Sequence, residues 1–505
     1  MVIVKFTIKG DLVFRDKLCE LANSNKRAEI VYEESEKNQI VFYADSDIKY
    51  IFENIDIFGL NCELYISTSE GCVSVLDVEK LQELQNDLIT KKDWKTVKVI
   101  NRLFIEYDSY KKNIEVSYYP TNLQIEHTNI CNSKCIMCEH FFTRNHNGKF
   151  VDESFIEKLK PILPYLEKIT LHGMGEPFLH PNISEFIKLY DAYGIKMTAA
   201  TNGMIMSEEL ASLIGKAFYS LTVSCDGCTQ NTFEGIRKGL SFEKFLSNIK
   251  LLRKKCPTLE MKMSTVAMRQ NLHELPGIVK LAHELGFDMI IISDVTTQEI
   301  MKNTGDSITF FPKTAQYYLK QAKSVAEKLD IDIQCPDYIF KIKGKLSFEE
   351  EQEIIKELQV FPDDSLEEEL YKKYAEIGFL DPKIQATMSN FVVPSKYNCE
   401  GICNFVLERP FLDINGNLFL CCTNWMHITG NVFKDGSFMS VWNGEIYKGI
   451  RKLFYDGKVP QYCVGCIFLR NDILVNRINI SNMDAEFYKH NYDKAVSKLI
   501  EDGIK

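Results

Sequence analysis

The sequence has no apolar run long enough to span a membrane, and its first residues alternate like a strand where a secretory signal would have a basic stretch and an apolar core. Basic side chains are not in excess: 60 Lys and Arg stand against 70 Asp and Glu, and the net charge of -10 argues against general binding to nucleic acid or to an anionic membrane. The chain also has no internal repeat and no low-complexity linker. We therefore expect a globular, cytoplasmic protein whose partners are neither nucleic acids nor membranes.

A group of three cysteines is the most informative pattern that the sequence does contain. Cys131, Cys135 and Cys138 are separated by three and then two residues and follow an apolar run at 123–126. Three thiolates at this spacing can hold three irons of a four-iron cluster and leave the fourth iron open, whereas an electron-carrying cluster normally takes four cysteines. A zinc knuckle that lacks one ligand and a set of buried free thiols are the plainer alternatives in a chain with 16 cysteines.

Polar segments follow these cysteines, each at the end of an apolar run. They contain Gly173, Gly175 and Glu176, then Asn202, and then Ser224 and Asp226. Taken singly, each segment is typical of an ordinary turn, because Asn-Gly and Asp-Gly are common turn dipeptides. In this order, over roughly 122–466, the cysteines and the segments resemble the radical S-adenosylmethionine (radical SAM) superfamily.

The resemblance implies a cofactor and its contacts. The open iron would bind the amino and carboxylate groups of S-adenosylmethionine, and an electron from the cluster would cleave the cofactor to a 5'-deoxyadenosyl radical. Glycines would let the backbone approach the cofactor's amino group, and polar side chains would contact that group, the ribose and the carboxylate. The implied cofactor-binding residues are Gly173, Gly175, Glu176, Asn202, Ser224 and Asp226. Met174, which separates the two glycines, departs from the family's pattern.

Short apolar runs rich in β-branched residues alternate with amphipathic stretches through the middle of the chain. The runs lie at 123–127, 167–171, 195–200, 219–224, 259–267 and 287–293, and the amphipathic stretches at 155–163, 183–193, 208–215, 242–254 and 275–286. Strand alternating with helix predicts a parallel sheet with helices outside. The six units predict an α/β fold, an open, partial (β/α)6 barrel at 118–340, with its chemistry at the carboxyl ends of the strands.

A second group of cysteines lies near the C-terminus. Cys403, Cys421, Cys463 and Cys466 surround a predicted hairpin, in which 411–414 and 417–420 alternate about Asn415-Gly416. This group resembles the twitch domain, a shorter relative of the SPASM domain, and implies one auxiliary [4Fe-4S] cluster held by four cysteines. Cys399 and Cys422 are possible alternative ligands, and a four-cysteine zinc site is the structural alternative. The dense middle run of the two-cluster SPASM arrangement is absent from the sequence.

The remaining cysteines have no spacing typical of a metal site, except the pair Cys225 and Cys228, for which free thiols are the simpler interpretation. Together with oxygen-sensitive clusters, so many unpaired thiols indicate a reducing compartment.

The 505 residues predict more than one domain. At 1–110 the order of runs is βαββαβ, which predicts a ferredoxin-like α+β domain and does not look like the winged-helix domain of peptide-modifying relatives. At 341–395 a charged helical insertion is expected, with a solvated face, which could cover the barrel mouth. A twitch or SPASM-like domain at 396–475 and a helical tail at 476–505 complete the division.

The parts together predict a radical SAM enzyme that abstracts hydrogen from a substrate, with the auxiliary cluster assisting oxidation of the substrate radical. The best guess is an oxidoreductase acting on a sugar-like or cyclitol small molecule, reduced by a flavodoxin- or ferredoxin-type donor. Peptide or protein side-chain modification is the runner-up. A non-catalytic iron-sulfur electron carrier and a zinc-stabilised binding module are alternatives of other classes. No catalytic residue is predicted; His127 and His172 lie near the site, but single histidines more often serve packing.

Overall fold

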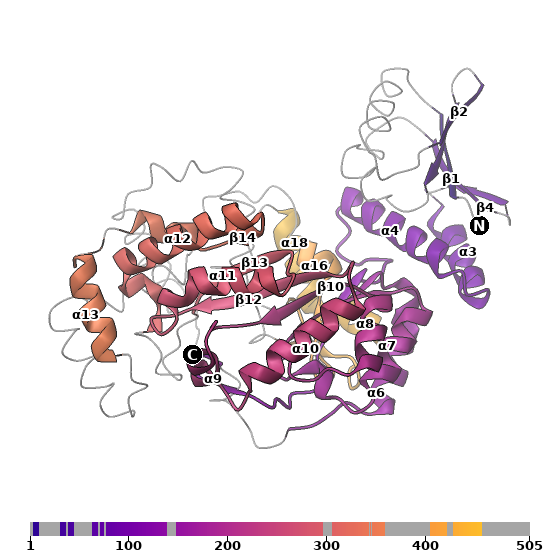
Figure 1. Cartoon of the computed structure of the whole chain (residues 1–505). Helices are drawn as coiled ribbons and strands as arrows, with labels where there is room; N and C mark the ends of the chain where they lie inside the picture. The colour runs from indigo at the N-terminus through magenta and orange to yellow at the C-terminus, as the bar shows by residue number, and fades with distance from the viewer. Residues whose placement is uncertain are drawn as a thin grey trace.

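The computed structural model describes residues 4–9, 31–36, 39–44, 63–68, 71–74, 77–138, 148–295, 306–342, 344, 346–358, 404–421 and 428–456. Among the helices in these ranges, none is long and apolar enough to cross a membrane. Figure 1 follows the chain from the N-terminal strands in indigo, through a central sheet with its helices in magenta and orange, to the C-terminal helices in yellow.

A parallel sheet forms the centre of the described molecule. Its strands are β6 (Asn122–Ile125), β8 (Lys168–Leu171), β9 (Lys196–Thr201), β10 (Phe218–Ser224), β12 (Glu260–Ala267), β13 (Met289–Asp294) and β14 (Asp332–Gln334). They lie side by side in chain order, and each pair of neighbours is parallel. The predicted α/β fold is confirmed, and β14 adds a strand to the six that the periodicity predicted.

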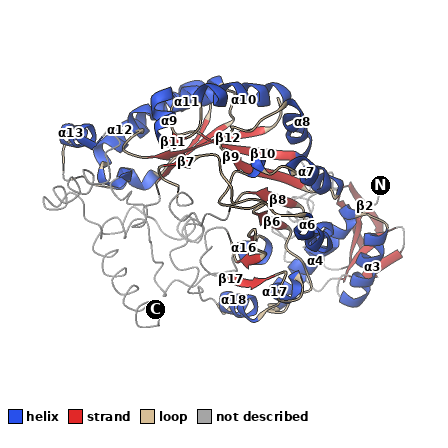
Figure 2. Ribbon diagram, turned by 90° about the horizontal axis from the view of Figure 1, so that it is seen from below, coloured by secondary structure: helices blue, strands red, loops and turns tan. Residues whose placement is uncertain are grey.

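The two faces of this sheet have different environments. Along β8, β9, β10 and β12 one set of alternating side chains is fully buried, as with Ile169 and Leu171, while the residues between them are half-exposed, as with Thr170. Figure 2 shows α8 (Glu208–Ala217), α10 (Phe242–Lys255) and α11 (Leu275–Glu284) along one side of the sheet. The buried set therefore packs against the helices, and the half-exposed set faces the opposite side.

The connecting helices begin where the sequence supplies a capping side chain. Asp152, Ser207 and Ser241 accept hydrogen bonds from the first turns of α6, α8 and α10. The amphipathic stretch predicted at 155–163 divides into an α-helix and a 3-10 helix, because the second of these contains Pro161 and Pro164. The other elements of this layer are α6 (Glu153–Leu159), η1 (Lys160–Tyr165), η2 (Pro177–Leu179), α7 (Ile183–Ala192), α9 (Gln230–Ile236), η3 (Leu272–Glu274), η6 (Ile308–Phe310), α12 (Pro312–Leu329) and η7 (Asp337–Lys341).

The predicted C-terminal hairpin is confirmed and extends the same sheet. Strand β15 (Phe411–Leu412) pairs antiparallel with β16 (Asn417–Phe419), and Gly416 has φ +80° in the turn, where a glycine is favoured. On its other side β15 pairs in parallel with β6. The hairpin is followed by β17 (Ile428–Asn431), which pairs with β16, and then by the helices α17 (Phe438–Trp442) and α18 (Glu445–Tyr455). The hairpin was predicted as part of a separate domain, and its continuity with the central sheet is a feature that the local pattern did not indicate.

The N-terminal strands have the predicted ferredoxin-like order. Their spatial order is β2-β3-β1-β4-β5, and the neighbours are antiparallel. The strands are β1 (Val4–Lys9), β2 (Val31–Glu36), β3 (Gln39–Ala44), β4 (Glu63–Thr68) and β5 (Gly71–Ser74). The helices predicted at 15–22 and 48–58 lie outside the described residues.

Two helices that the sequence analysis did not predict connect this sheet to the barrel. They are α3 (Val78–Thr90) and α4 (Trp94–Lys111), and the capping residues Asp77 and Asp93 were the available signals. Helix α4 joins the barrel through buried apolar residues and through Lys98, whose Nζ donates to the carbonyl of Tyr193 at 2.7 Å. In Figure 1 these two helices lie between the N-terminal strands and the barrel.

The charged insertion is described only in its first part, α13 (Phe348–Leu358). The predicted solvated face holds for Glu349 and Glu350, but it is wrong for Glu351, which is fully buried. The Glu351 carboxylate accepts from the amides of Lys313 and Thr314, at 3.2 and 2.7 Å, and so caps the N-terminus of α12. The rest of the insertion and the tail at 476–505 lie outside the described residues.

Candidate active site

The three predicted cluster cysteines lie on the loop after β6. Cys135 is buried, Cys131 and Cys138 are half-buried, and none of the three is in a disulfide. The loop is fixed locally, because the Thr128 hydroxyl accepts from the amide of Ile130 at 2.9 Å and donates to the carbonyl of Lys149 at 3.0 Å. The amide of Cys138 donates to the carbonyl of Cys135 at 3.1 Å, which closes a backbone turn between the two cysteines.

The electrostatics of these thiols indicate that they are close together. The pKa of Cys131 is raised to about 11, first by burial and then by the negative charges of Glu176, Cys135 and Cys138. Among the described residues, however, no three His, Cys, Asp or Glu side chains converge as the ligands of one metal ion do.

A short ribbon holds the centre of the cysteine loop. Strand β7 (Lys134–Cys135) pairs antiparallel with β11 (Arg237–Lys238), with Cys135 opposite Arg237 and Lys134 opposite Lys238. The amide of Ile136 extends the ribbon by donating to the carbonyl of Ile236 at 3.0 Å. The ribbon therefore ties the cysteine loop to the segment that follows α9.

The loop after β8 contains Gly173, Gly175 and Glu176 and packs directly on the cysteine loop. A Cβ at Gly175 would lie 2.6 Å from the carbonyl oxygen of Ile130, and a Cβ at Gly173 would lie 2.6 Å from Cβ of Glu126. The amide of Glu176 also donates to the carbonyl of Ile130 at 2.9 Å. Both glycines are thus required by contacts within the chain itself, in addition to any contact with a cofactor.

Glu126, at the end of β6, is a site residue that the sequence analysis did not single out. Its Oε1 accepts from the amide of Met174 at 2.6 Å, and its Oε2 accepts from the amide of Ile414 at 3.3 Å. Burial raises the pKa of the Glu126 carboxyl, and the hydrogen bonds from the two amides partly oppose this shift. The available signal was an acidic residue immediately after an apolar strand that leads into the cysteine loop.

Glu176 is buried, and its carboxylate connects the ends of two strands. Its oxygens accept from the Thr201 hydroxyl and from the Asn202 amide, each at 2.7 Å. Burial raises the pKa of Glu176 to about 7, although these hydrogen bonds act to lower it. The carboxylate thus has partners within the chain at both oxygens.

Asn202 and Ser224 lie at the carboxyl ends of β9 and β10. The amide nitrogen Nδ2 of Asn202 donates to Oδ1 of Asn132 on the cysteine loop at 2.7 Å, and Oδ1 of Asn202 accepts from the amide of Met204. Ser224 is half-buried on the face opposite the helices. The predicted site residues of three neighbouring strands therefore meet at one edge of the sheet, as expected for a parallel arrangement.

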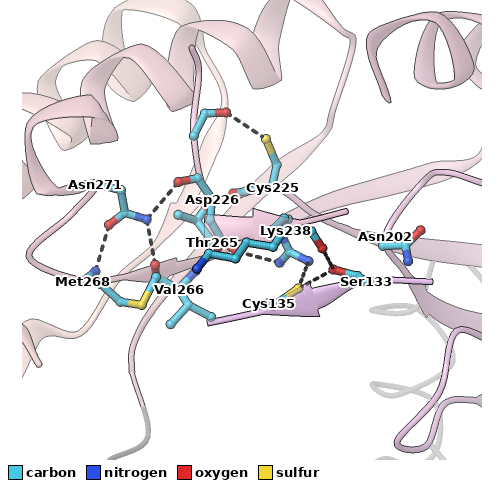
Figure 3. A network of polar contacts seen from close by, with 12 residues as sticks. Ser133, Cys135, Asn202, Cys225, Asp226, Lys238, Thr265, Val266, Met268 and Asn271 are labelled. Atoms are coloured by element: carbon cyan, nitrogen blue, oxygen red, sulfur yellow. Dashed lines mark hydrogen bonds and ion pairs between the residues drawn. The ribbon is translucent and has the colours of Figure 1, made fainter. Parts of the chain in front are cut away.

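Asp226 is fully buried behind the cysteine loop and is paired with Arg237. Arg237 Nη2 lies 2.7 Å from Asp226 Oδ2, and Asp226 Oδ1 accepts from the amide of Val266 at 2.7 Å. Burial raises the pKa of the Asp226 carboxyl, and the Arg237 guanidinium opposes this shift. Figure 3 shows the carboxylate among Cys225, Thr265 and Asn271, next to the ribbon that carries Cys135.

Comparison with known proteins agrees with this site. Residues 125–282 match the model of the radical SAM superfamily, and residues 403–467 match that of the SPASM iron-sulfur cluster-binding domain. The chain contains a radical SAM domain followed by a SPASM domain. These two domains imply S-adenosylmethionine and [4Fe-4S] clusters as the cofactors.

Relatives share the radical SAM region at low identity. An AdoMet-dependent heme synthase of Methanosarcina barkeri is 27% identical over 34% of this chain and 50% of its own length. A PqqA peptide cyclase of Bradyrhizobium diazoefficiens is 23% identical over 46% of this chain and 62% of its own length. The chain thus spans about half to three fifths of these relatives. The solved structure of Streptococcus suis SuiB bound to the precursor peptide SuiA is similar with a TM-score of 0.46 and 14% identity, over 71% of this chain and 72% of that chain.

The residues of the radical SAM domain fit a cluster with one open iron. The domain presents three cysteines outside any disulfide on one loop, and the ribbon, Thr128 and Asn202 hold that loop. The Cys131 thiol, whose pKa is raised, would lose its proton on binding a metal. The donor set is therefore suited to iron at three corners of a cluster.

The SPASM domain is described only in part. Of the four predicted ligands, Cys421 is described, half-buried at the end of the β15–β16 hairpin, while Cys403, Cys463 and Cys466 lie outside the described residues, as do Cys399 and Cys422. Helix α18 stands beside the hairpin, since the Tyr447 hydroxyl donates to the carbonyl of Phe419 at 3.2 Å. The buried Arg451 guanidinium lies 4.8 Å from the centre of the Trp442 ring, which further fixes this helix.

The histidines near the site differ in their surroundings. His127 is buried, bonded through Nε2 to the Tyr190 hydroxyl at 2.8 Å and stacked on Phe186, and burial lowers its pKa to about 3. His127 is thus a packing residue. His172 follows β8 and its side chain is exposed. The pKa of its imidazole is nevertheless lowered, first by desolvation from the surrounding protein and then by the positive charge of Arg409.

Proposed function

We propose that this chain is a radical SAM enzyme that removes a hydrogen atom from a polar substrate and oxidises the resulting substrate radical with the help of its SPASM domain. The observation that carries the proposal is the placement of Cys131, Cys135 and Cys138, outside any disulfide, on a loop that the β7–β11 ribbon ties down at the carboxyl edge of a parallel sheet. Bound to a reduced [4Fe-4S] cluster, S-adenosylmethionine supplies a 5'-deoxyadenosyl radical that can attack an unactivated C–H bond. The protein's own contribution is to bind, orient and exclude water.

The chain's residues would divide this work between direct contact and support. Gly173, Gly175, Asn202 and Ser224 are the residues that we propose to line the cofactor site. Glu176 would act mainly through Thr201 and Asn202, because both of its oxygens already accept hydrogen bonds from them. Asp226 would likewise act through its neighbours.

The auxiliary site would hold a second [4Fe-4S] cluster on Cys403, Cys421, Cys463 and Cys466, with Cys399 or Cys422 as an alternative ligand. A closed four-cysteine site leaves no iron open for a substrate and therefore suits electron transfer. Uptake of one electron from a substrate radical would make the reaction an oxidation. The position of Cys421 on a hairpin that pairs with β6 supports this role, because β6 leads directly into the loop of the first cluster.

The half-exposed face of the sheet supports a polar substrate. Its side chains include the hydroxyls of Thr170, Thr198, Thr222, Ser224 and Ser264. Hydroxyl groups can both donate to and accept from a substrate that is rich in oxygen. A sugar-like or cyclitol small molecule is therefore our first candidate. A peptide is the second, supported by the match to a peptide cyclase, and the match to a heme synthase shows that this region occurs in proteins with different substrates.

The electron donor in our proposal is an acidic carrier of the flavodoxin or ferredoxin type. Lys134 and Lys238 are exposed and stand opposite each other on the ribbon that carries Cys135. The net charge of the chain is -10, so an acidic partner is repelled by the molecule as a whole. A local pair of positive charges next to a cluster ligand would favour its approach at this place. The free thiols of the described cysteines support a reducing compartment, for which we propose the cytoplasm.

Iron and sulfide analysis of anaerobically purified protein tests the proposal. We expect about eight irons in the wild type and about four when Cys131, Cys135 and Cys138 are all changed to Ala. The double variant of Cys225 and Cys228 to Ala is the matched control and should keep about eight, because these thiols bond to carbonyl groups of Gly227 and Glu274. The wild type should also form 5'-deoxyadenosine and methionine from S-adenosylmethionine with dithionite.

The alternatives give different results in the same experiment. Iron without cofactor cleavage would favour a non-catalytic electron carrier. About four irons, all lost in the triple variant, would make the C-terminal group a zinc or thiol site. Zinc without iron in a colourless protein would favour a binding module and contradict the radical SAM function altogether.

A further inference from the structure

Arg237 lies against the central cysteine of the cluster loop and belongs to no predicted cofactor contact. Its Nη1 is 3.8 Å from Sγ of Cys135, and the Ser133 hydroxyl is 2.9 Å from the same sulfur. The register of the ribbon produces this contact, because Arg237 is the direct cross-strand partner of Cys135. Figure 3 shows Ser133 beside the Cys135 sulfur, with a dashed line between them.

The guanidinium is held in place from the other side. Nη2 pairs with Asp226 Oδ2 at 2.7 Å, and Asp226 in turn accepts from the amide of Val266. The Asn271 side chain donates to the carbonyls of Asp226 and Val266, at 3.0 and 2.9 Å, which fixes the loop around the carboxylate. Arg237 and Asp226 are 7% and 0% exposed, so neither group can move away into water.

Stability alone gives no reason for this buried pair. A buried ion pair generally contributes no more than apolar residues of the same volume would, because removing two charges from water is costly. The pair does, however, leave one guanidinium nitrogen directed at a cluster ligand. Hydrogen bonds to the sulfurs are among the factors that set the reduction potential of an iron-sulfur cluster, and residues that support metal ligands also determine how well the metal is retained.

We propose that Arg237 is a positioning residue of the SAM-binding cluster: anchored by Asp226, it donates to the Cys135 thiolate together with Ser133, and so raises the reduction potential of this cluster and retains its iron. The inference rests on the proposed function, since it requires a cluster on Cys135. The direction follows from charge. Reduction adds an electron to the cluster, and a positive donor stabilises the reduced form more than the oxidised form.

Potentiometric titration followed by electron paramagnetic resonance tests the role of Arg237. In Arg237→Gln we expect the equilibrium of the three-cysteine cluster with its reductant to become about tenfold less favourable, which is a fall of about 59 mV for a one-electron couple. Ser133→Ala should lower the potential in the same direction, and Arg237→Lys should lie between Gln and wild type, because it keeps the charge and loses the planar fork. The auxiliary cluster should keep its potential in all three variants.

Arg269→Gln is the matched control, because Arg269 forms a second buried ion pair, 2.9 Å from Asp306, with exposures of 2% and 7% for the two side chains. It should leave the potential of the three-cysteine cluster unchanged. Selective loss of this cluster from Arg237→Gln, with the auxiliary cluster kept, would also support the proposal. If Arg237→Gln fails to fold, Arg237→Lys and Ser133→Ala decide.

Potentials equal to wild type in these variants, with full iron content, would overturn the inference. Its failure is distinguishable from failure of the proposed function, because the wild type would then still bind the cluster and cleave S-adenosylmethionine. A wild type without iron at Cys131, Cys135 and Cys138 would instead overturn both.

Discussion

The carboxylate of Glu126 accepts a hydrogen bond from the amide of Ile414, 3.3 Å away and 288 positions further along the chain. Its other oxygen accepts from Met174 in the loop that packs on the cysteine loop. One side chain therefore connects the radical SAM loops with the hairpin of the SPASM domain. The connection fixes the hairpin that leads to Cys421 against the radical SAM loops through the central sheet.

Replacing Glu126 by Gln should weaken this connection. A Gln side chain has one carbonyl oxygen, so one of the two amides would face an NH2 group and lose its acceptor. An unsatisfied buried donor costs about 1–3 kcal/mol, so we expect the free energy of unfolding of the iron-loaded protein to fall by that amount and its thermal midpoint to fall with it. Glu185→Gln, which removes an exposed partner of Lys188, is the control and should change stability by no more than about 0.5 kcal/mol. Equal midpoints for the two variants would contradict the connecting role of Glu126.

Gly175→Ala should release the three-cysteine cluster. The new Cβ would lie 2.6 Å from the carbonyl oxygen of Ile130, and a backbone atom cannot rotate away as a side chain can. The cysteine loop would have to move, so we expect about four irons in place of about eight after anaerobic purification. Gly449→Ala is the matched control, because a Cβ at Gly449 in α18 would meet nothing within 4 Å. That change should keep all the iron and stabilise the helix by up to about 1 kcal/mol.

The stability of the site should fall as the pH rises through the range in which Glu176 ionises. Its pKa is raised from 4.5 to about 7, so between these values the folded protein binds more protons than the unfolded chain. The contribution of Glu176 to the free energy of unfolding is highest below about pH 4.5. It decreases by about 3 kcal/mol as the pH rises to about 7 and then levels off. Thermal midpoints of wild type and Glu176→Gln at pH 5, 6, 7 and 8 provide the measurement. The difference between the two proteins should change across this range, and a constant difference would show that Glu176 ionises normally.

Much of the fold was predictable because its signals are local. The runs at 168–171 and 196–200 alternate with a clear period and became β8 and β9, and Asn415-Gly416 gave the hairpin. The ribbon of β7 and β11 could not be found in this way, because a strand of two residues has no periodicity. The contacts of Arg237 with Cys135, and of Glu126 with Ile414, depend on pairings between distant segments, which composition and spacing do not record. The three cysteines could be predicted from a motif, while the residues that contact Cys135 and hold its loop in place could not.

The ribbon of β7 and β11 is the proposed docking surface for the electron carrier. If an acidic carrier docks on the ribbon, Lys134→Glu should slow reduction of the three-cysteine cluster by a recombinant flavodoxin at low salt, because a repulsive charge then stands next to Cys135. Added salt should slow the wild type and narrow its difference from the variant, since screening weakens attraction and repulsion alike. Reduction by dithionite reports whether the cluster itself is intact and should be equal in both proteins. Lys320→Glu, an exposed change of the same charge on the outer helix α12, should leave the flavodoxin rate unchanged. Equal slowing by the two substitutions would show that only net charge matters, and equal flavodoxin rates for Lys134→Glu and wild type would place the docking surface elsewhere on the molecule.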